Sequence, residues 1–468
     1  MTRFTHLHTH SHYSLLTALP KIDQLVAAAK KDGLTSLALT DNGNLYGAIE
    51  FYKECKKKEI KPIIGVDFYV ALRTRKDMQA GIDNRRTRLV LLAMNETGYK
   101  NLIRLVTDSH LEGFYYKPRI DRELLEKYNE GLIAISPSFS GEIAQALKGR
   151  NQDKAKEIAN FYKNVFGYNK IPRLFIEITR HPEIDGHESR MKTLVEFAKS
   201  EDIPIIAAHD VYYLEQGDRF VRETLLRVNS HSDQSEKVSD GDDDDFSFIR
   251  SARAEELFRD LPEALENTAK IADQCNLELK LGNWVFPDFK VESGRSPDDE
   301  LRHLVFQGFT ERKVTETPEL DKRAEYELKI IKDKGYSPYF LVVADMLRFA
   351  RENKILSNIR GSVSGSLVTF LAGITNINPI EYEIPFERFL NPDRPSAPDI
   401  DMDYADDRRD EVIDYVRRKY GADKVAQIGT FGTMMARGSV RDVARAMGFE
   451  YAIGDRISKL IPMGSQGF

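Results

Sequence analysis

Three aspartates alternate with apolar residues in the segment PDIDMDY, residues 398–404. Successive side chains of a β-strand point to opposite faces, so an extended segment would place Asp399, Asp401 and Asp403 on one face. The residues between them would pack into a core. Aspartate is depleted in strands, and like charges on one face destabilise a sheet, so a cation must offset these carboxylates. The alternation therefore predicts a metal-binding face.

The carboxylate chemistry of this segment favours Mg²⁺, a hard cation that takes oxygen ligands. Two such ions, about 3.5–4 Å apart, form the clamp used in nucleotidyl transfer. The alternative is an acidic loop before the helix expected over 406–420, which starts with Asp406 and Asp407 and ends with basic residues before Gly421, as the helix dipole favours. That alternative explains Asp406 and Asp407 but not the alternation, and spacing alone leaves both open.

A Gly/Ser-rich segment, RGSVSGS at 360–366, precedes the strongly apolar run Leu367–Leu371. Glycines let a backbone approach a phosphate closely, and N–H groups at a helix start point toward an anion. No Gly-Lys-Ser/Thr follows, so the segment is not a P-loop, and a tight turn is the simpler alternative. The residues predicted to bind substrate phosphates are Arg360, Gly361, Ser362, Gly365 and Ser366.

Four histidines occupy every second position of the segment HLHTHSH, residues 6–12. In a strand they would share a face, and imidazole is the commonest ligand of Zn²⁺ and related metals. Two same-face histidines at the end of a first strand would suit a metallophosphoesterase. The alternative is a fortuitous His-rich edge strand.

Strand-like and helix-like stretches alternate through residues 1–226. Helix-like segments such as Ile22–Lys31 and 44–58 separate short apolar runs. This alternation predicts α/β units with a mostly parallel sheet or barrel, in which the chemistry lies at the C-terminal ends of strands. The runs predicted as strands are 34–40, 62–70, 88–94, 131–136, 174–178 and 203–208.

The second half of the chain differs in composition from the first. Residues 229–249 are rich in Ser, Asp and Gly and predict a solvated loop, and a helix interrupted by Pro262 is expected over 253–280. We place the main domain boundary near 280. Beyond it helices dominate, at 300–313, 318–334 and 339–353.

The composition is that of an ordinary globular protein. The chain has 468 residues, enough for two to four domains, with 41% hydrophobic and 30% charged residues. Two cysteines are too few for a disulfide framework and predict a reducing, cytoplasmic compartment. We expect no signal peptide and no membrane span. A net charge of −6 argues against general nucleic-acid coating but allows a local basic groove.

Longer motifs resemble the alpha subunits of bacterial DNA polymerase III, the C-family replicative polymerases. The N-terminal half resembles their PHP (polymerase and histidinol phosphatase) domain through HLHTHSHYSLL and LALTDNGNLYGAIEFYKECKKKEIKPIIGVDFYV. The later half resembles their polymerase region through KGYSPYFLVVADM, RGSVSGSLVTFLAGITNINPI, FERFLNPDRPSAPDIDMDYADDRRDEVIDYV and QIGTFGTMMARGSVRDVARAMG. The resemblance covers essentially the whole chain.

The resemblance implies a fold and an activity. The expected domains are a PHP domain (a distorted β/α barrel) over 1–280, the first part of a polymerase-beta-like nucleotidyltransferase palm (α+β) over 281–430, and the start of a helical thumb over 431–468. The implied activity is that of a DNA-directed DNA polymerase, which adds dNTPs to a primer 3′ end by two-metal nucleotidyl transfer. Asp399 and Asp401 match the family's first two catalytic aspartates and would hold Mg²⁺; Asp403 also belongs to the family's pattern.

The resemblance also implies partners and one limit. The expected partners are primer–template DNA, dNTPs, a sliding clamp, a clamp loader and a proofreading subunit, with no membrane. The family's third palm aspartate, its fingers and its C-terminal domains would follow Phe468, so we expect the chain by itself to be inactive.

The PHP metal motifs depart from the family at several positions. His8, His10, Asp67 and Asp210 match metal-binding positions, but Thr17, Asn42, Ser138 and Tyr212 stand where the family has ligands. Losing several nitrogen and sulfur ligands costs metal affinity, so we expect little binding of Zn²⁺ or Mn²⁺. The PHP domain is then predicted to be mainly structural or a docking surface. A metallophosphoesterase or 3′–5′ exonuclease module and a non-catalytic scaffold remain the alternative functions.

Overall fold

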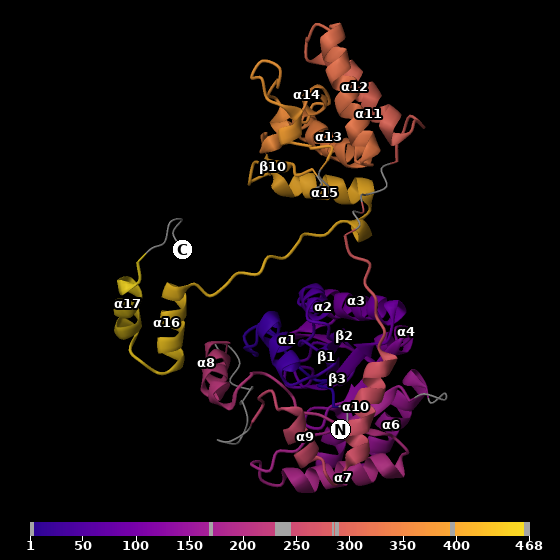
Figure 1. Ribbon diagram of the computed structural model, residues 1–468, viewed down its shortest axis with the longest axis vertical. Coiled ribbons are helices and arrows are strands. Elements are labelled where there is room, and N and C mark those ends of the chain that lie inside the picture. The colour runs from indigo at the N-terminus through magenta and orange to yellow at the C-terminus, as the bar shows by residue number, and fades with distance from the viewer. Residues whose placement is uncertain are drawn as a thin grey trace. The chain divides into compact units, whose positions relative to one another are not determined.

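The chain forms two compact units. The computed structural model describes residues 4–167, 172–229, 245–282, 285, 290–393 and 398–462. Most of the predicted acidic loop, 230–244, and the last residues, 463–468, lie outside the described residues. One unit comprises Met1–Leu279 with Thr433–Phe468, and the other comprises Lys280–Gly432 (Figure 1). The segment predicted as a separate thumb start is thus grouped with the first unit.

The first unit is built around an eight-stranded mixed sheet with the order β4-β5-β2-β3-β6-β7-β8, in which β1 also pairs with β2. Strand β3 runs antiparallel to both its neighbours, whereas β1, β5, β7 and β8 are paired in parallel. All six apolar runs predicted as strands form strands. The strands are β1 (Ser36–Leu39), β2 (Lys61–Ala71), β3 (Arg86–Ala93), β4 (Phe114–Tyr115), β5 (Lys117–Ile120), β6 (Leu132–Ser136), β7 (Leu174–Ile178) and β8 (Ile205–Ala207).

The histidine segment closes this sheet into a distorted barrel. The prediction of a regular strand at 6–12 is wrong, because the segment makes a single bridge, from Thr9 to Val211. The Thr9 carbonyl accepts from the Thr40 N–H at 2.8 Å, and the His10 N–H donates to the Val211 carbonyl at 3.0 Å. These bonds link the end of β1 to the chain just after β8. The segment is irregular, but it joins the β1 side of the sheet to the β8 side.

Apolar side chains fill both faces of the curled sheet. Helix α10 (Pro262–Gln274) adds Ile271 and Ala272 to the smaller of two core clusters. Burial on both faces explains why these strands read as continuous apolar runs rather than as alternating patterns. Apart from Cys275, which follows α10, the remainder of the smaller cluster comes from the histidine segment and the strands: Leu7, Ala38, Ile63, Val90, Leu92, Ile133, Ile135, Phe175 and Ile206.

Most helices of this unit lie around the sheet, whereas α16 and α17 lie beside α8 (Figure 1). The helix predicted over 253–280 is two helices, because Pro262 starts a new one at a position where its missing N–H costs nothing. Helix α16 packs on α17 and on α8, where Nη2 of Arg445 reaches the Val228 carbonyl at 3.4 Å. The remaining helices are α1 (Ile22–Lys31), α2 (Ala48–Lys57), α3 (Glu96–Leu111), α4 (Arg122–Lys127), α5 (Glu142–Lys148), α6 (Gln152–Phe166), α7 (His187–Ser200), α8 (Arg219–Asn229), α9 (Ser251–Leu257), α16 (Ala436–Ala446) and α17 (Tyr451–Leu460).

The second unit packs helices around its own core and carries a two-stranded antiparallel sheet. The helices predicted near 300–313, 318–334, 339–353 and 406–420 are all present. Gly308 allows α11 to touch α14, because a Cβ there would lie 2.2 Å from the Leu371 carbonyl oxygen. The elements are α11 (Pro297–Glu311), α12 (Pro318–Asp333), α13 (Ser337–Glu352), β9 (Ser357–Arg360), α14 (Leu367–Leu371), β10 (Asp401–Tyr404) and α15 (Arg409–Tyr420).

In the described part of the chain, every helix is too short or too polar to cross a membrane.

Candidate active site

The predicted aspartate face lies on β10 and on the residues just before it. Ile400 is buried in the core of the second unit at 7% exposure, whereas Asp399 and Asp401 on either side of it are exposed. Met402 and Tyr404 pack against the same core. The alternation therefore separates a buried face from a carboxylate face, as the spacing indicates.

The third aspartate of the series is held by an arginine. Strand β10 pairs with β9 so that Asp401 lies opposite Arg360. The Arg360 guanidinium reaches past it to Asp403, with Nη2 3.0 Å from Oδ1 and Nε 2.5 Å from Oδ2. The hydrogen bond from Arg360 lowers the pKa of Asp403 below its usual value. Asp403 is thus already paired with a cation, and in the described part of the chain neither Asp399 nor Asp401 has an ion-pair partner.

The Gly/Ser turn brings backbone beside these carboxylates. Gly361 has a φ of +96°, which favours glycine, and a Cβ at this position would lie 3.8 Å from Oδ2 of Asp401. Gly361 and Ser362 are exposed, and Ser362 starts a short 3-10 turn that ends at Gly365. The start of the turn therefore faces the same solvent region as Asp401.

The end of the turn is buried and bound to another acid. Ser366 is fully buried and donates its hydroxyl to Oε2 of Glu327 at 2.7 Å. The same carboxylate accepts the N–H groups of Leu367 at 3.2 Å and Val368 at 3.0 Å. The first N–H groups of α14 are thus satisfied internally. The structure brings Arg360, Gly361 and Ser362 to the aspartates, but it buries Gly365 and Ser366.

Glu327 was not identified in the sequence. It is 0% exposed and pairs with Arg323, one helical turn earlier, at 2.6 Å. Burial raises the pKa of Glu327, although the Arg323 hydrogen bond opposes this effect. The available signal was an acid inside the apolar stripe of the helix EYELKII, residues 325–331.

Tyr339 is a second neighbour of the aspartates. Burial raises the pKa of Tyr339, a backbone hydrogen bond at Ile400 lowers it, and the carboxylates of Asp399 and Asp401 raise it further. Both carboxylates therefore lie near enough to Tyr339 to act on its phenol.

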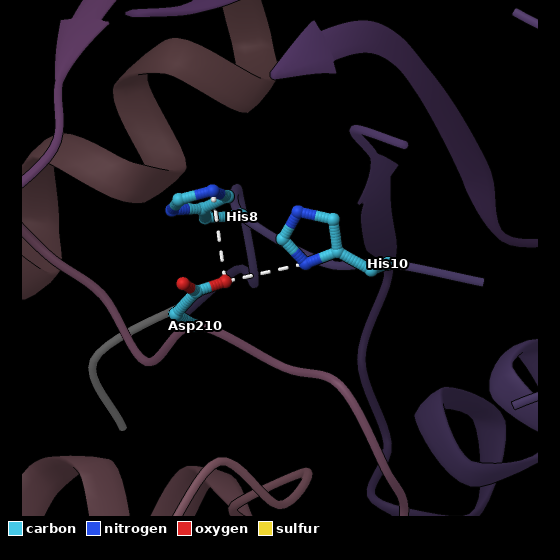
Figure 2. A group of neighbouring side chains, drawn as sticks. All are labelled: His8, His10 and Asp210. Carbon is cyan, nitrogen blue, oxygen red and sulfur yellow. Dashed lines mark ion pairs between the residues drawn. The ribbon is translucent and has the colours of Figure 1, made fainter. Parts of the chain in front are cut away.

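A second cluster of ionisable side chains lies in the barrel of the first unit. His8, His10 and Asp210 each turn one ligand atom toward the others, and these atoms all lie within 4.8 Å of one another (Figure 2). Oδ1 of Asp210 is 3.2 Å from Nδ1 of His10 and 3.6 Å from Nε2 of His8. Burial raises the pKa of Asp210, but the two histidines outweigh it and bring the pKa to about 2.

Two further carboxylates contact His8. Its Nε2 lies 3.2 Å from Oδ2 of Asp67, and its Nδ1 lies 2.7 Å from Oε2 of Glu177. Burial lowers the pKa of His8, but Asp210, Glu177 and Asp67 together raise it well above its ordinary value. Glu177 was not identified in the sequence; its signal was a single charge in the buried strand LFIEI.

The residues that stand where the family has metal ligands contact neighbouring side chains through hydrogen bonds or ring stacking. Thr17 accepts a hydrogen bond from the Asn42 side-chain amide at 3.1 Å. The Ser138 hydroxyl lies 3.2 Å from Oε1 of Glu177. The Tyr212 ring stacks on His10 with 4.1 Å between ring centroids and 8° between planes.

His8, His10 and Asp210 fit one divalent cation. Two imidazoles and a carboxylate are a usual donor set for Zn²⁺ or Mn²⁺. Nε2 of His10 and Oδ1 of Asp210 are buried and make no hydrogen bond to any part of the chain that the structure describes. Asp67 and Asp210 open onto a cavity of about 1300 Å³ whose wall carries many arginine and lysine side chains.

The two halves of the chain match two different family models. Residues 6–181 match the PHP domain, and residues 299–467 match the bacterial DNA polymerase III alpha NTPase domain. The first match begins at the histidine segment, and the second includes both the Gly/Ser turn and β10.

Curated relatives match over nearly the whole chain. The DNA polymerase III subunit alpha of Borreliella burgdorferi is 40% identical over 99% of this chain and 40% of its own length. The subunits of Aquifex aeolicus and Treponema pallidum are each 38% identical over 98% of this chain and cover 41% and 39% of their own lengths. The chain belongs to the family of bacterial DNA polymerase III alpha subunits.

The alpha-subunit relatives are much longer than this chain. The chain spans about 40% of the length of the curated relatives that it matches. The family membership thus rests on residues that match the PHP domain and the alpha NTPase domain.

Proposed function

We propose that this chain is the N-terminal part of a replicative DNA polymerase, which extends a primer 3′ end with dNTPs on a DNA template. The observation that carries this proposal is the exposed pair Asp399 and Asp401 beside the Gly361 turn. The family membership supports it, because the matching region includes both elements.

Within this proposal, Asp399 and Asp401 are the metal-binding carboxylates. Mg²⁺ held there would act as a Lewis acid that activates the primer hydroxyl and stabilises the leaving pyrophosphate. Ile400, which lies between these two aspartates, packs into the core of the second unit and so fixes the backbone that carries Asp399 and Asp401. Asp403 instead positions Arg360 through their ion pair.

The Gly/Ser turn is proposed to bind the triphosphate through its exposed start. Gly361 and Ser362 can approach an anion directly, and Arg360 lies beside them. Gly365 and Ser366 serve this function indirectly: the Gly365 carbonyl accepts from Arg323 and the Ser366 hydroxyl donates to Glu327, so both anchor the turn rather than contact the nucleotide.

Replacing Asp401 by Asn in the full-length parent protein tests the polymerase proposal. Primer extension should be lost while the thermal unfolding profile stays the same, because the side chain is exposed. Asp407→Asn is the matched control, since Asp407 is an exposed carboxylate at the start of α15 and should leave extension intact. Unchanged extension in the Asp401 variant would refute the assignment.

The remaining partners follow from the same family membership. We propose that the intact protein works with a sliding clamp, a clamp loader and a proofreading subunit in the cytoplasm. Co-purification of the tagged full-length protein from its own cells checks this, with recovery of the three partner classes as the expected result.

The PHP domain is proposed to be mainly structural or a docking surface. The hydrogen bonds of Thr17, Asn42 and Ser138 with their neighbours support this, because these side chains stabilise the barrel where the family binds metal. Metal analysis of the purified protein tests it. Tightly bound, stoichiometric Zn²⁺ or Mn²⁺ would instead favour a metallophosphoesterase or 3′–5′ exonuclease.

A further inference from the structure

We infer that Arg88 is a built-in cation of the PHP centre, which takes the place of a metal ion between Asn42 and Asp67. This inference does not depend on the polymerase activity proposed above. It concerns the side of the cluster formed by Asn42 and Asp67, and the Asp67 oxygen that Arg88 binds also lies 3.2 Å from Nε2 of His8.

The register of the sheet places Arg88 beside Asp67. On the antiparallel pair β2 and β3, Arg88 lies opposite Tyr69 and Asp67 lies opposite Val90. Arg88 and Asp67 are therefore diagonal neighbours on one face, close enough for long side chains to meet. The guanidinium carbon lies 4.2 Å from the centre of the Tyr69 ring, which supports the side chain from one side.

The Arg88 guanidinium forms hydrogen bonds with the oxygen atoms of Asn42 and Asp67 that a metal ion at this place would bind. Its Nε donates to Oδ1 of Asp67 at 3.0 Å, and its Nη2 donates to Oδ2 of the same carboxylate and to Oδ1 of Asn42. Asn42 and Asp67 occupy two of the family's metal-binding positions. A cation that bound both of them would have to displace Arg88.

The exchange of a metal for an arginine is favoured by burial. The Asp67 side chain is 2% exposed and the Arg88 side chain is 14% exposed. A buried carboxylate needs a compensating positive charge, and the arginine side chain carries one at every physiological pH. Arg88 provides that charge whether or not metal is available, so this half of the centre should be stable in a chelator.

The test is the melting temperature of the purified chain in EDTA and in MnCl₂, for the wild type and for Arg88→Gln. In EDTA the variant should melt on the order of 10 °C lower, because the buried Asp67 carboxylate loses its guanidinium partner and is left with His8 at 3.2 Å and His10 at 3.5 Å. MnCl₂ should raise the melting temperature of the variant more than that of the wild type. Arg88→Lys should recover part of the stability in EDTA, because the positive charge is kept.

Two further variants complete the test. Arg85→Gln is the matched control, because Arg85 is an exposed arginine that lines the same cavity, and it should behave as the wild type does. Asp67→Asn combined with Arg88→Gln should abolish the extra response to MnCl₂, since the unpaired charge is gone. If Arg88→Gln alone fails to fold, a folded double variant supports the inference and an unfolded one overturns it.

Equal melting temperatures of wild type and Arg88→Gln in EDTA would overturn the inference. An equal gain from MnCl₂ in both proteins would also overturn it.

Discussion

At the scale of single residues, the three aspartates of the segment 398–404 are not equivalent. Asp399 and Asp401 are exposed and act together on Tyr339, whereas Asp403 is bound by Arg360. A cation already bound to a carboxylate competes with a metal ion for the same oxygens. Asp403 is therefore the member of the series least suited to a metal.

Asp403→Asn should reduce primer extension by the full-length protein far less than Asp401→Asn. The ion pair with Arg360 is exposed to solvent, so its loss should change the stability little. Primer-extension rates of the two variants, compared at equal concentration, check this. A loss as complete as that of Asp401→Asn would place Asp403 among the metal ligands.

Glu327→Ala should destabilise the second unit by about 2–4 kcal/mol, because it leaves the Ser366 hydroxyl and two N–H groups of α14 buried without an acceptor. Urea unfolding followed by circular dichroism measures the cost. Glu327→Gln keeps an acceptor oxygen and should recover part of it. Equal stability of the alanine variant and the wild type would show that the cap is unimportant.

At the scale of elements, buried charges join segments that lie far apart in the sequence. Asp345 on α13 accepts hydrogen bonds from Tyr415, Tyr420 and Lys419, so it fastens α15 to α13. Arg119 on β5 likewise holds the connection between β2 and β3, because its guanidinium donates to carbonyl groups of that connection. These contacts fix the strands that carry the site residues.

Asp345→Asn should lower the free energy of unfolding at pH 7 by about 1–2 kcal/mol. Burial raises the pKa of Asp345, but the hydrogen bonds from Lys419, Tyr415 and Tyr420 lower it below its usual value. Such a group stabilises the fold above its unfolded pKa of about 4, and the benefit is lost as the pH falls through its folded value. The difference between wild type and variant should therefore shrink below about pH 4; a constant difference from pH 7 to pH 3 would contradict this.

Arg119→Lys should cost the first unit about 2–4 kcal/mol. The buried Arg119 guanidinium donates to the carbonyls of Gly113, Asp83, Arg75 and Asp77 at 2.8–3.0 Å. A single ammonium group cannot reach all four. Thermal unfolding measures the loss, and an unchanged melting temperature would contradict the prediction.

At the scale of the whole molecule, the chain has two units with separate cores. The core that contains Phe68 is built from residues 4–277, and the core that contains Phe340 is built from residues 301–400. A connection without a shared core allows each unit to unfold by itself.

Phe340→Ala should destabilise the second unit by about 3–5 kcal/mol and leave the first unit unaffected, because Phe340 is fully buried in the second core. Differential scanning calorimetry should show one transition lowered and one unchanged. Phe68→Ala is the reciprocal control and should lower the other transition. A single transition that shifts in both variants would show that the units unfold together.

Much of this protein was determined by local sequence patterns. Six strands of the first unit, several of the helices and the shared face of the aspartates were predictable, because side-chain periodicity depends on the backbone geometry of one element. Spacing predicted that Asp399 and Asp401 share one face but left an acidic loop open as the alternative to a metal site, and the longer motifs identified the family.

Contacts between distant segments were decided by the tertiary structure alone. The backbone of the histidine segment bonds to the residue after β1 on one side and to Val211 on the other. Ser366 is buried because Glu327, 39 residues earlier, caps α14. Arg88 meets Asp67 through the register of β2 and β3. No local pattern encodes these pairings, because each depends on where packing places two elements.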